Sequence, residues 1–450
     1  MANFAKASAP RFSVDVYQNE YLPEGGREVH AIITVTATGG GTTGRVLLAG
    51  STDPRIADPQ QPEAGVVIMV DTSGSMDYPP TKLANARAAT GAAIQTVRDG
   101  VGFAVVAGTH KAVEIYPGNG RLAIASPRTR EEAQWALGHL TAGGGTAIGT
   151  WLRLAADLLD HSGATIRHGI LLTDGRNEHE APADLRAALD HCAGRFTCDA
   201  RGVGTDWEVK EVTQIASALL GSADIVADPG GLTADFTTMM RQAMGKGVAD
   251  VALRLWTPQG AEVQFVKQVA PRVENLTPRR VDVNARAGDY PTGSWGDESR
   301  DYHVCVRVPA AGVGQEMLAA RASLVLPSPG GPPETLAHAL MRAVWTNDMM
   351  ASTAINPQVA HYTGQAELAR VIQQGLELRK SGDESGATAK LGRAVQLAAA
   401  SGNNETARLL SKVVDVVDAA TGTVRLKAKV AEADEMTLET RSTKTVRVKK

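Results

Sequence analysis

The chain has 450 residues, more than one hydrophobic core normally supports, so we expect two or three domains. Its hydrophobic content of 43% and charged content of 21% are ordinary for a globular protein, and a net charge of -3 excludes a global attraction to nucleic acid or anionic membranes. The first residues lack a signal peptide's apolar core, and no apolar run approaches the roughly 20 residues of a membrane span. We therefore expect a cytoplasmic protein with neither a nucleic-acid nor a membrane partner.

Residues 11–50 alternate apolar and polar side chains between glycine-rich turns, which predicts two or three half-buried strands, one of them at 45–48. A proline-rich linker follows over residues 53–62. These strands alone are too few to bury a core.

The pattern changes at Gly65, where a continuous apolar run predicts a strand covered on both faces. Beyond it, strand-like and helix-like segments alternate, which is typical of a parallel α/β sheet. The expected strands are 101–107, 112–116, 168–173, 196–203 and 223–226. The expected helices are 81–97, 131–140, 147–159, 182–189, 209–220 and 233–244. We therefore predict a doubly wound, mostly parallel, Rossmann-like α/β domain over residues 61–246.

Strand-like alternation returns over residues 247–327. The simplest arrangement is one β-sandwich formed by residues 1–60 and 247–327, with the α/β domain inserted in one of its loops. Residues 334–420, beyond a linker rich in proline and glycine, carry three apolar helical faces, with Asp383 and Asn404 as N-caps. We expect a small helical bundle there.

The tail at residues 421–450 is polar and is predicted to be mobile. It contains Thr437, Thr440, Thr443 and Thr445 among acidic and basic residues. One hypothesis is that a Ser/Thr kinase phosphorylates this tail and thereby creates a docking site for a phosphothreonine reader. The alternative is a solvated tail that only keeps the protein in solution.

The three cysteines, Cys192, Cys198 and Cys305, are too sparse for a disulfide framework. Cys192 and Cys198 also lack the spacing of a zinc site. We therefore expect buried, inert thiols.

Oxygen-bearing side chains follow three of the predicted strands. Asp71, Ser73 and Ser75 share one tight loop after the first strand, Thr146 follows three glycines, and Asp174 ends another strand. In an open parallel sheet, ligands bind at the carboxyl ends of the strands. Hydroxyls and carboxylates without cysteine or histidine are the ligands of Mg²⁺ or Mn²⁺. Because Mg²⁺ takes six ligands, these five leave a position that a partner's carboxylate can fill.

The ordered set Asp-x-Ser-x-Ser, Thr after a glycine-rich turn, and Thr-Asp-Gly resembles the metal-ion-dependent adhesion site of von Willebrand factor A (VWA) domains. The resemblance covers about residues 62–246, and all five positions match. It implies that the serines and the threonine ligate the metal directly or through water, and that the aspartates often act through water. The wider chain resembles intracellular bacterial proteins that often accompany Ser/Thr kinases and phosphothreonine-reading modules, so such partners are implied as well.

Three other functions are possible for a chain with this pattern. A metal-dependent hydrolase or phosphatase would use the same loops, with Ser73 or Ser75 as nucleophile, but the chain has no Gly-x-Ser-x-Gly elbow and no phosphate-binding loop. A dinucleotide-binding protein would need a glycine-rich loop directly after the first strand, but this strand ends in Asp71-Thr-Ser. A structural scaffold with a degenerate site also remains open. We expect a non-enzymatic protein-interaction module.

Overall fold

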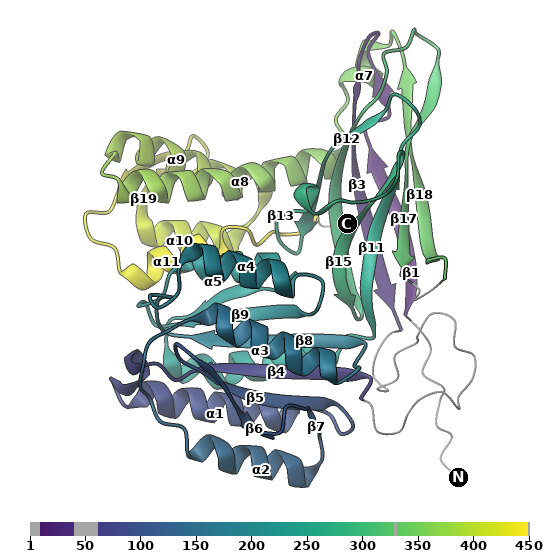
Figure 1. The fold of residues 1–450 in the computed structure, drawn as a ribbon. Coiled ribbons are helices and arrows are strands. Elements are labelled where there is room, and N and C mark those ends of the chain that lie inside the picture. Colours follow the sequence, from purple (N-terminus) through teal and green to yellow (C-terminus); the bar gives the residue numbers. More distant parts are fainter. Residues whose placement is uncertain (1–9, 40–61, 328–330, 449–450) are drawn as a thin grey trace, which may run out of the picture. The chain divides into compact units, whose positions relative to one another are not determined.

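A computed structural model describes residues 10–39, 62–327 and 331–448 (Figure 1). The strand expected at 45–48 and most of the predicted linker at 53–62 lie outside these residues. The chain divides into two compact units. Among the described residues, the first unit holds 62–249 and 293–296, and the second holds the remainder.

The first unit is a seven-stranded sheet with helices on both faces (Figure 1). Its strands are β4 (Ala64–Asp71), β5 (Gly102–Gly108), β6 (Ala112–Tyr116), β7 (Ala123–Ile124), β8 (Ile166–Thr173), β9 (Thr197–Val203) and β10 (Ala223–Val226). The order is β10-β9-β8-β4-β5-β6, with β7 also pairing with β5, and only β6 and β7 run antiparallel to β5. The chain crosses from β4 to β5 on one side and later to β8 on the other, so the topological switch point lies between β4 and β8. This confirms the predicted doubly wound, mostly parallel sheet.

The helices of the first unit are α1 (Thr81–Thr96), α2 (Pro127–Gly138), α3 (Ile148–His161), α4 (Pro182–Cys192), α5 (Val209–Ala218) and α6 (Leu232–Met244). A core cluster joins β4 and β5 to α1, α2 and α6. Because β4 is buried along both faces, its sequence is a continuous apolar run and not an alternating one. None of the described helices in the chain has the length and hydropathy needed to cross a membrane.

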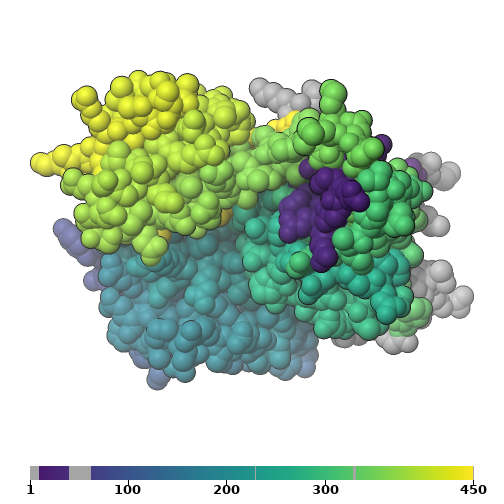
Figure 2. Space-filling model, turned by 90° about the horizontal axis from the view of Figure 1, so that it is seen from above, coloured from purple at the N-terminus to yellow at the C-terminus, as the bar shows by residue number. Residues whose placement is uncertain are grey.

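The second unit contains a sandwich of two sheets, ordered β1-β3-β16-β12-β13 and β14-β15-β11-β17-β18-β2. The strands are β1 (Arg11–Gln18), β2 (Tyr21–Leu22), β3 (Glu28–Thr38), β11 (Val248–Trp256), β12 (Glu262–Ala270), β13 (Glu274–Asn275), β14 (Val281–Asn284), β15 (Ala287–Trp295), β16 (Glu298–Arg307), β17 (Glu316–Leu326) and β18 (Glu334–Trp345). β3 pairs with β16 along ten residues, so strands before and after the first unit share one sheet. Figure 2 shows the purple N-terminal residues among the teal and green residues of the sandwich.

The helical part of the second unit begins later than the sequence suggested. Residues 334–345, expected at the start of the helical region, form β18 and pair with β17, because their apolar side chains alternate and β17 offers a free edge. The helices are α7 (Met349–Thr353), α8 (Pro357–Lys380), α9 (Glu384–Ser401), α10 (Asn404–Val413) and α11 (Glu432–Arg441). Asp383 caps α9 as expected, whereas Asn403, and not Asn404, caps α10.

The third predicted helical face is wrong at its C-terminal end. The helix stops at Val413, and the chain turns into a hairpin of β19 (Val414–Asp418) and β20 (Thr423–Leu426). Val417, expected on the buried face, is 60% exposed. A run of β-branched residues favours a strand over a helix, and here that local preference decides the structure.

The polar tail is folded along most of its described length, contrary to the predicted mobility. Helix α11 buries Leu438 in the helical core, together with residues of α8, α9 and α10. Beyond it, the Val273 amide donates to the Thr443 carbonyl at 2.8 Å, and the Arg447 guanidinium lies 3.2 Å from the buried carboxylate of Asp301. The few apolar residues of the tail therefore suffice to anchor it, although its composition is polar.

Candidate metal centre

The first loop of the site begins at Asp71, the last residue of β4. Both carboxylate oxygens of Asp71 are bonded: Oδ1 accepts the Ser73 amide N–H at 2.8 Å, and Oδ2 accepts the Thr173 hydroxyl at 2.7 Å. Its side chain is fully buried. Asp71 therefore fixes both the start of its own loop and the end of the neighbouring strand β8.

Three hydroxyls and a second carboxylate converge beside Asp71. The Ser73 and Ser75 hydroxyl oxygens lie 2.9 Å apart, and Ser75 donates to Asp174 Oδ1 at 2.7 Å. Gly175 shows where the third hydroxyl lies: a Cβ added there would be 3.1 Å from Ser75 Oγ, 3.6 Å from Thr146 Oγ1 and 3.9 Å from Ser73 Oγ. The structure thus brings together all five residues predicted from the sequence.

Backbone bonds hold the loop of Thr146 against the loop of Asp71. The Gly74 amide donates to the Gly144 carbonyl at 2.9 Å, and the Gly143 amide donates to the Thr72 carbonyl at 2.8 Å. A side chain at Gly144 would also be strained, because its φ of 81° lies in the left-handed region. The left-handed turn at Gly144 therefore places the backbone of this loop where it bonds to the loop of Asp71.

The buried carboxylates create a need for positive charge. Burial raises the pKa of Asp71 to about 6, against the lowering effect of its hydrogen bonds to Ser73 and Thr173, and the nearby charge of Asp174 raises it further. Asp174 is also fully buried. Two carboxylates in a low-dielectric site are stable as anions only with a cation close by.

Lys82, which the sequence reasoning missed, supplies such a cation. Its ammonium lies 2.7 Å from Asp174 Oδ2 and 3.1 Å from Asp206 Oδ2. Burial alone would lower the pKa of Lys82, but the hydrogen bonds to the two aspartates outweigh it and raise that pKa. Lys82 lies in the first turn of α1, where a positive charge opposes the helix dipole. This unfavourable position is the feature of the sequence that could have suggested a carboxylate partner for Lys82. Thr173 was also missed, although it directly precedes the predicted Asp174.

The donor set fits a hard divalent cation. Three hydroxyls and two carboxylates converge, and the absence of a side chain at Gly175 leaves space among the hydroxyls. Oxygen donors of this kind suit Mg²⁺ and Mn²⁺. In this structure the serine hydroxyls bond to each other and to Asp174, and Asp174 also pairs with Lys82. A bound metal ion would have to replace these bonds.

Comparisons with known proteins agree with the fold. Residues 64–225 match the von Willebrand factor type A domain, and residues 396–442 match the von Willebrand factor type A C-terminal domain. A solved structure of a von Willebrand factor type A protein from Catenulispora acidiphila is 48% identical, with a TM-score of 0.90 and coverage of 99% of both chains. The ArnB paralog VWA2 from Sulfolobus acidocaldarius is 14% identical, with a TM-score of 0.59, and the match covers 97% of this chain and 98% of that one, so it shows a shared fold. A search of curated proteins gave no match. The full-length similarity at 48% identity is decisive, and the chain belongs to the von Willebrand factor type A family.

Proposed function

We propose that this protein is a metal-dependent protein-interaction module, in which Asp71, Ser73, Ser75, Thr146 and Asp174 hold Mg²⁺ or Mn²⁺. The observation that supports it most is the convergence of three hydroxyls and two buried carboxylates at the switch point. A bound metal of this kind supplies an open coordination position for a partner's Asp or Glu carboxylate. The protein's own part is to position the oxygen ligands, four of which are buried, whereas Ser75 is exposed and accessible to a partner.

An exposed aromatic residue supports a partner surface beside the site. Tyr78 follows the loop of Ser75 by three residues, and its side chain is 82% exposed. Tyrosine is enriched among the residues that contribute most to protein interfaces. Tyr78 therefore offers an apolar contact next to the position where a partner carboxylate would bind.

A hydrolase or phosphatase at the same loops is the less favoured alternative. Hydrolysis through Ser73 or Ser75 needs a general base bonded to the hydroxyl. Among the described residues, the Ser73 and Ser75 hydroxyls bond to each other, and Ser75 also donates to Asp174 Oδ1. The other oxygen of that carboxylate is already ion-paired with Lys82, so Asp174 is not free to act as the base. His179, which lies beside the loop of Thr146, accepts the Thr146 backbone N–H through Nδ1 at 3.2 Å. These bonds favour a non-enzymatic role.

A link to Ser/Thr kinase signalling stays a prediction of the family resemblance. The tail adds little support, because the Thr437 and Thr440 hydroxyls donate to carbonyls within α11 and Thr440 is buried.

The test is capture of partners by the immobilised full-length protein in Mg²⁺ and in EDTA. We expect proteins that bind wild type in Mg²⁺, but bind neither wild type in EDTA nor the Asp71→Ala protein. Changing the responsible Asp or Glu of a captured protein to its amide should then abolish binding. Capture that is equal in Mg²⁺ and EDTA would refute the proposed function.

Lys82→Met should increase the affinity for Mg²⁺ by about tenfold or more, because a positive charge no longer competes for Asp174. The same change should lower the thermal midpoint of the metal-free protein, since it leaves a buried carboxylate without its ion pair. Calorimetric titration and thermal unfolding measure the two effects. Lys111→Met, at an exposed lysine of the same unit, is the matched control and should change neither. A lower Mg²⁺ affinity in Lys82→Met would show that the lysine assists the metal.

A further inference from the structure

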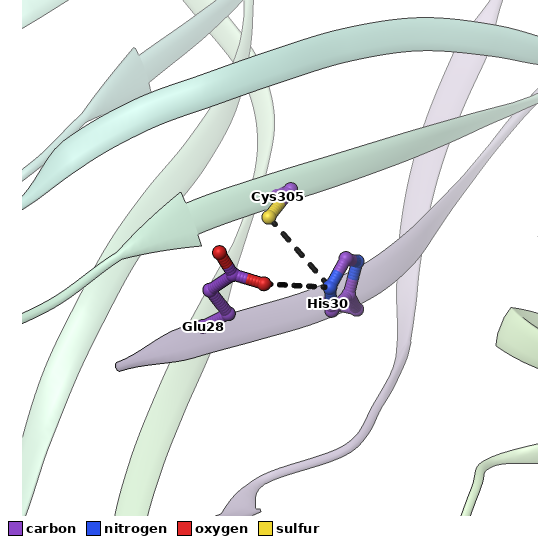
Figure 3. Close-up of side chains that lie close together, drawn as sticks. All are labelled: Glu28, His30 and Cys305. Atoms are coloured by element: carbon purple, nitrogen blue, oxygen red, sulfur yellow. Dashed lines mark hydrogen bonds and ion pairs between the residues drawn. The ribbon is translucent and has the colours of Figure 1, made fainter. Parts of the chain in front are cut away.

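A second group of potential metal ligands lies on the sandwich, in the second unit of the chain. Glu28 and His30 are two residues apart on β3, and Cys305 lies opposite His30 on β16 (Figure 3). One ligand atom from each of the three lies within 4.8 Å of the other two. His30 Nε2 is 3.8 Å from Cys305 Sγ and 3.9 Å from Glu28 Oε2. Cross-strand pairing therefore presents three different ligand types at one point.

These separations are close to those of a tetrahedral zinc site. Zinc binds sulfur at about 2.3 Å and nitrogen or oxygen at about 2.0–2.2 Å, so neighbouring ligand atoms lie roughly 3.4–3.6 Å apart. The two distances from His30 Nε2 exceed this by a few tenths of an ångström. Rotation of the Glu28 side chain, which is 65% exposed, can remove much of the difference.

A second histidine orients the first. His30 Nδ1 lies 3.2 Å from His303 Nε2, on the next same-face position of β16. If His30 donates its Nδ1–H to His303, its Nε2 carries the lone pair and faces Cys305 and Glu28. Histidines that bind metals are commonly held in this way by a partner on the other ring nitrogen.

We propose that Glu28, His30 and Cys305 form a zinc site on the sandwich sheet, with His303 as the positioning residue for His30. The thiolate and the carboxylate balance the two charges of Zn²⁺. As the sulfur–zinc bond forms, the Cys305 thiol proton is released to solvent. A thiolate and an imidazole favour zinc over Mg²⁺, which distinguishes this site from the oxygen-only centre of the first unit.

Three protein ligands leave the fourth tetrahedral position open. Glu28 lies at the end of β3 and is exposed, so this position faces solvent and accepts water or a donor side chain of another molecule. The metal also links β3 to β16, neighbouring strands of one sheet that are far apart in the sequence. The site therefore stabilises this strand pairing and offers a second metal-bound contact point.

The test uses Co²⁺ as a spectroscopic probe in the full chain carrying Asp71→Ala, so that the oxygen-only centre does not contribute. After chelator treatment, Co²⁺ should produce a thiolate-to-metal absorption band, and added Zn²⁺ should remove it. Adding Cys305→Ala should abolish the band. Adding Cys192→Ala, at a cysteine that is also buried, should preserve it. His303→Ala should weaken Co²⁺ binding by about 10–100-fold.

Glu28→Gln keeps the test informative if Cys305→Ala does not fold, because an exposed side chain can be changed without disturbing the core. It should reduce Co²⁺ affinity while leaving the thermal midpoint of the metal-free protein unchanged. A band that survives Cys305→Ala, the lack of any band in the Asp71→Ala protein, or an unchanged affinity in Glu28→Gln would overturn the proposal.

Discussion

Asp71→Ala should abolish the stabilisation of the protein by Mg²⁺. At a metal concentration of 100 times the Kd, wild type should gain about 2.7 kcal/mol in the free energy of unfolding, whereas the variant should gain nothing. The reason is that Asp71 is a proposed ligand and also fixes the Ser73 amide and the Thr173 hydroxyl. Thermal unfolding with and without Mg²⁺, together with calorimetric titration, measures the effect.

Gly175→Ala tests the same site by steric hindrance, because it adds a methyl group and keeps every oxygen ligand. Its new methyl group would lie 3.1 Å from Ser75 Oγ, among the three hydroxyls. It should weaken Mg²⁺ binding while the metal-free protein unfolds at nearly the wild-type temperature. Equal Mg²⁺ affinity in wild type and Asp71→Ala would show that the five residues do not form the metal centre.

Gly108→Ala should strongly destabilise the first unit. The added Cβ would lie 2.3 Å from two ring atoms of Trp151, a fully buried residue of α3. The Trp151 indole also donates to the Thr109 carbonyl at 2.6 Å, so the ring cannot move without losing that bond. Overpacking of this kind costs about 1–3 kcal/mol, and sometimes more. Chemical denaturation followed by tryptophan fluorescence measures the loss.

Gly138→Ala is the matched control for that measurement. It lies at the end of α2, is exposed, and has no atom within 4 Å of an added Cβ. Alanine favours helix over glycine, so this change should leave stability unchanged or raise it slightly. If Gly108→Ala were as stable as Gly138→Ala, the close packing of β5 against α3 would be incorrect.

The convergence of the five candidate ligands was predictable, because most of them stand at the same edge of a parallel sheet. Asp71, Thr146 and Asp174 are far apart in sequence, but each stands where a strand or turn leads toward a helix, and parallel strands end at one edge of the sheet. Lys82 was not predictable in the same way. Its ammonium reaches the site from a helix, and no spacing in the sequence shows which carboxylate a long, flexible side chain will meet.

The second unit was harder to predict from the sequence. Residues 334–345 fall within the predicted helical region but form β18. Their alternation of apolar and polar side chains indicates a strand only when β17 is known to offer a free edge for pairing. The polar composition of the tail predicts mobility. The burial of a single apolar residue such as Leu438 nevertheless anchors the tail, in spite of its many exposed charges. Cys305 is buried, as expected, but its neighbour in space, His30, is 275 residues away in the sequence, so no spacing indicates that the two residues meet.

The pairing of β3 with β16 has a consequence for synthesis of the chain. Thr36 on β3 and its partner Ser299 on β16 are separated by 263 residues. At about 5–20 residues per second, the ribosome needs roughly 13–50 s to deliver the partner strand. During that interval β1 and β3 can pair with each other but not with β16, and Ala31, Ile33 and Val35 of β3 stay exposed. The strands and helices of the first unit, in contrast, are complete well before β16 emerges. The nascent chain therefore carries an unfinished sheet during the folding of its middle, which is when a chaperone would be needed.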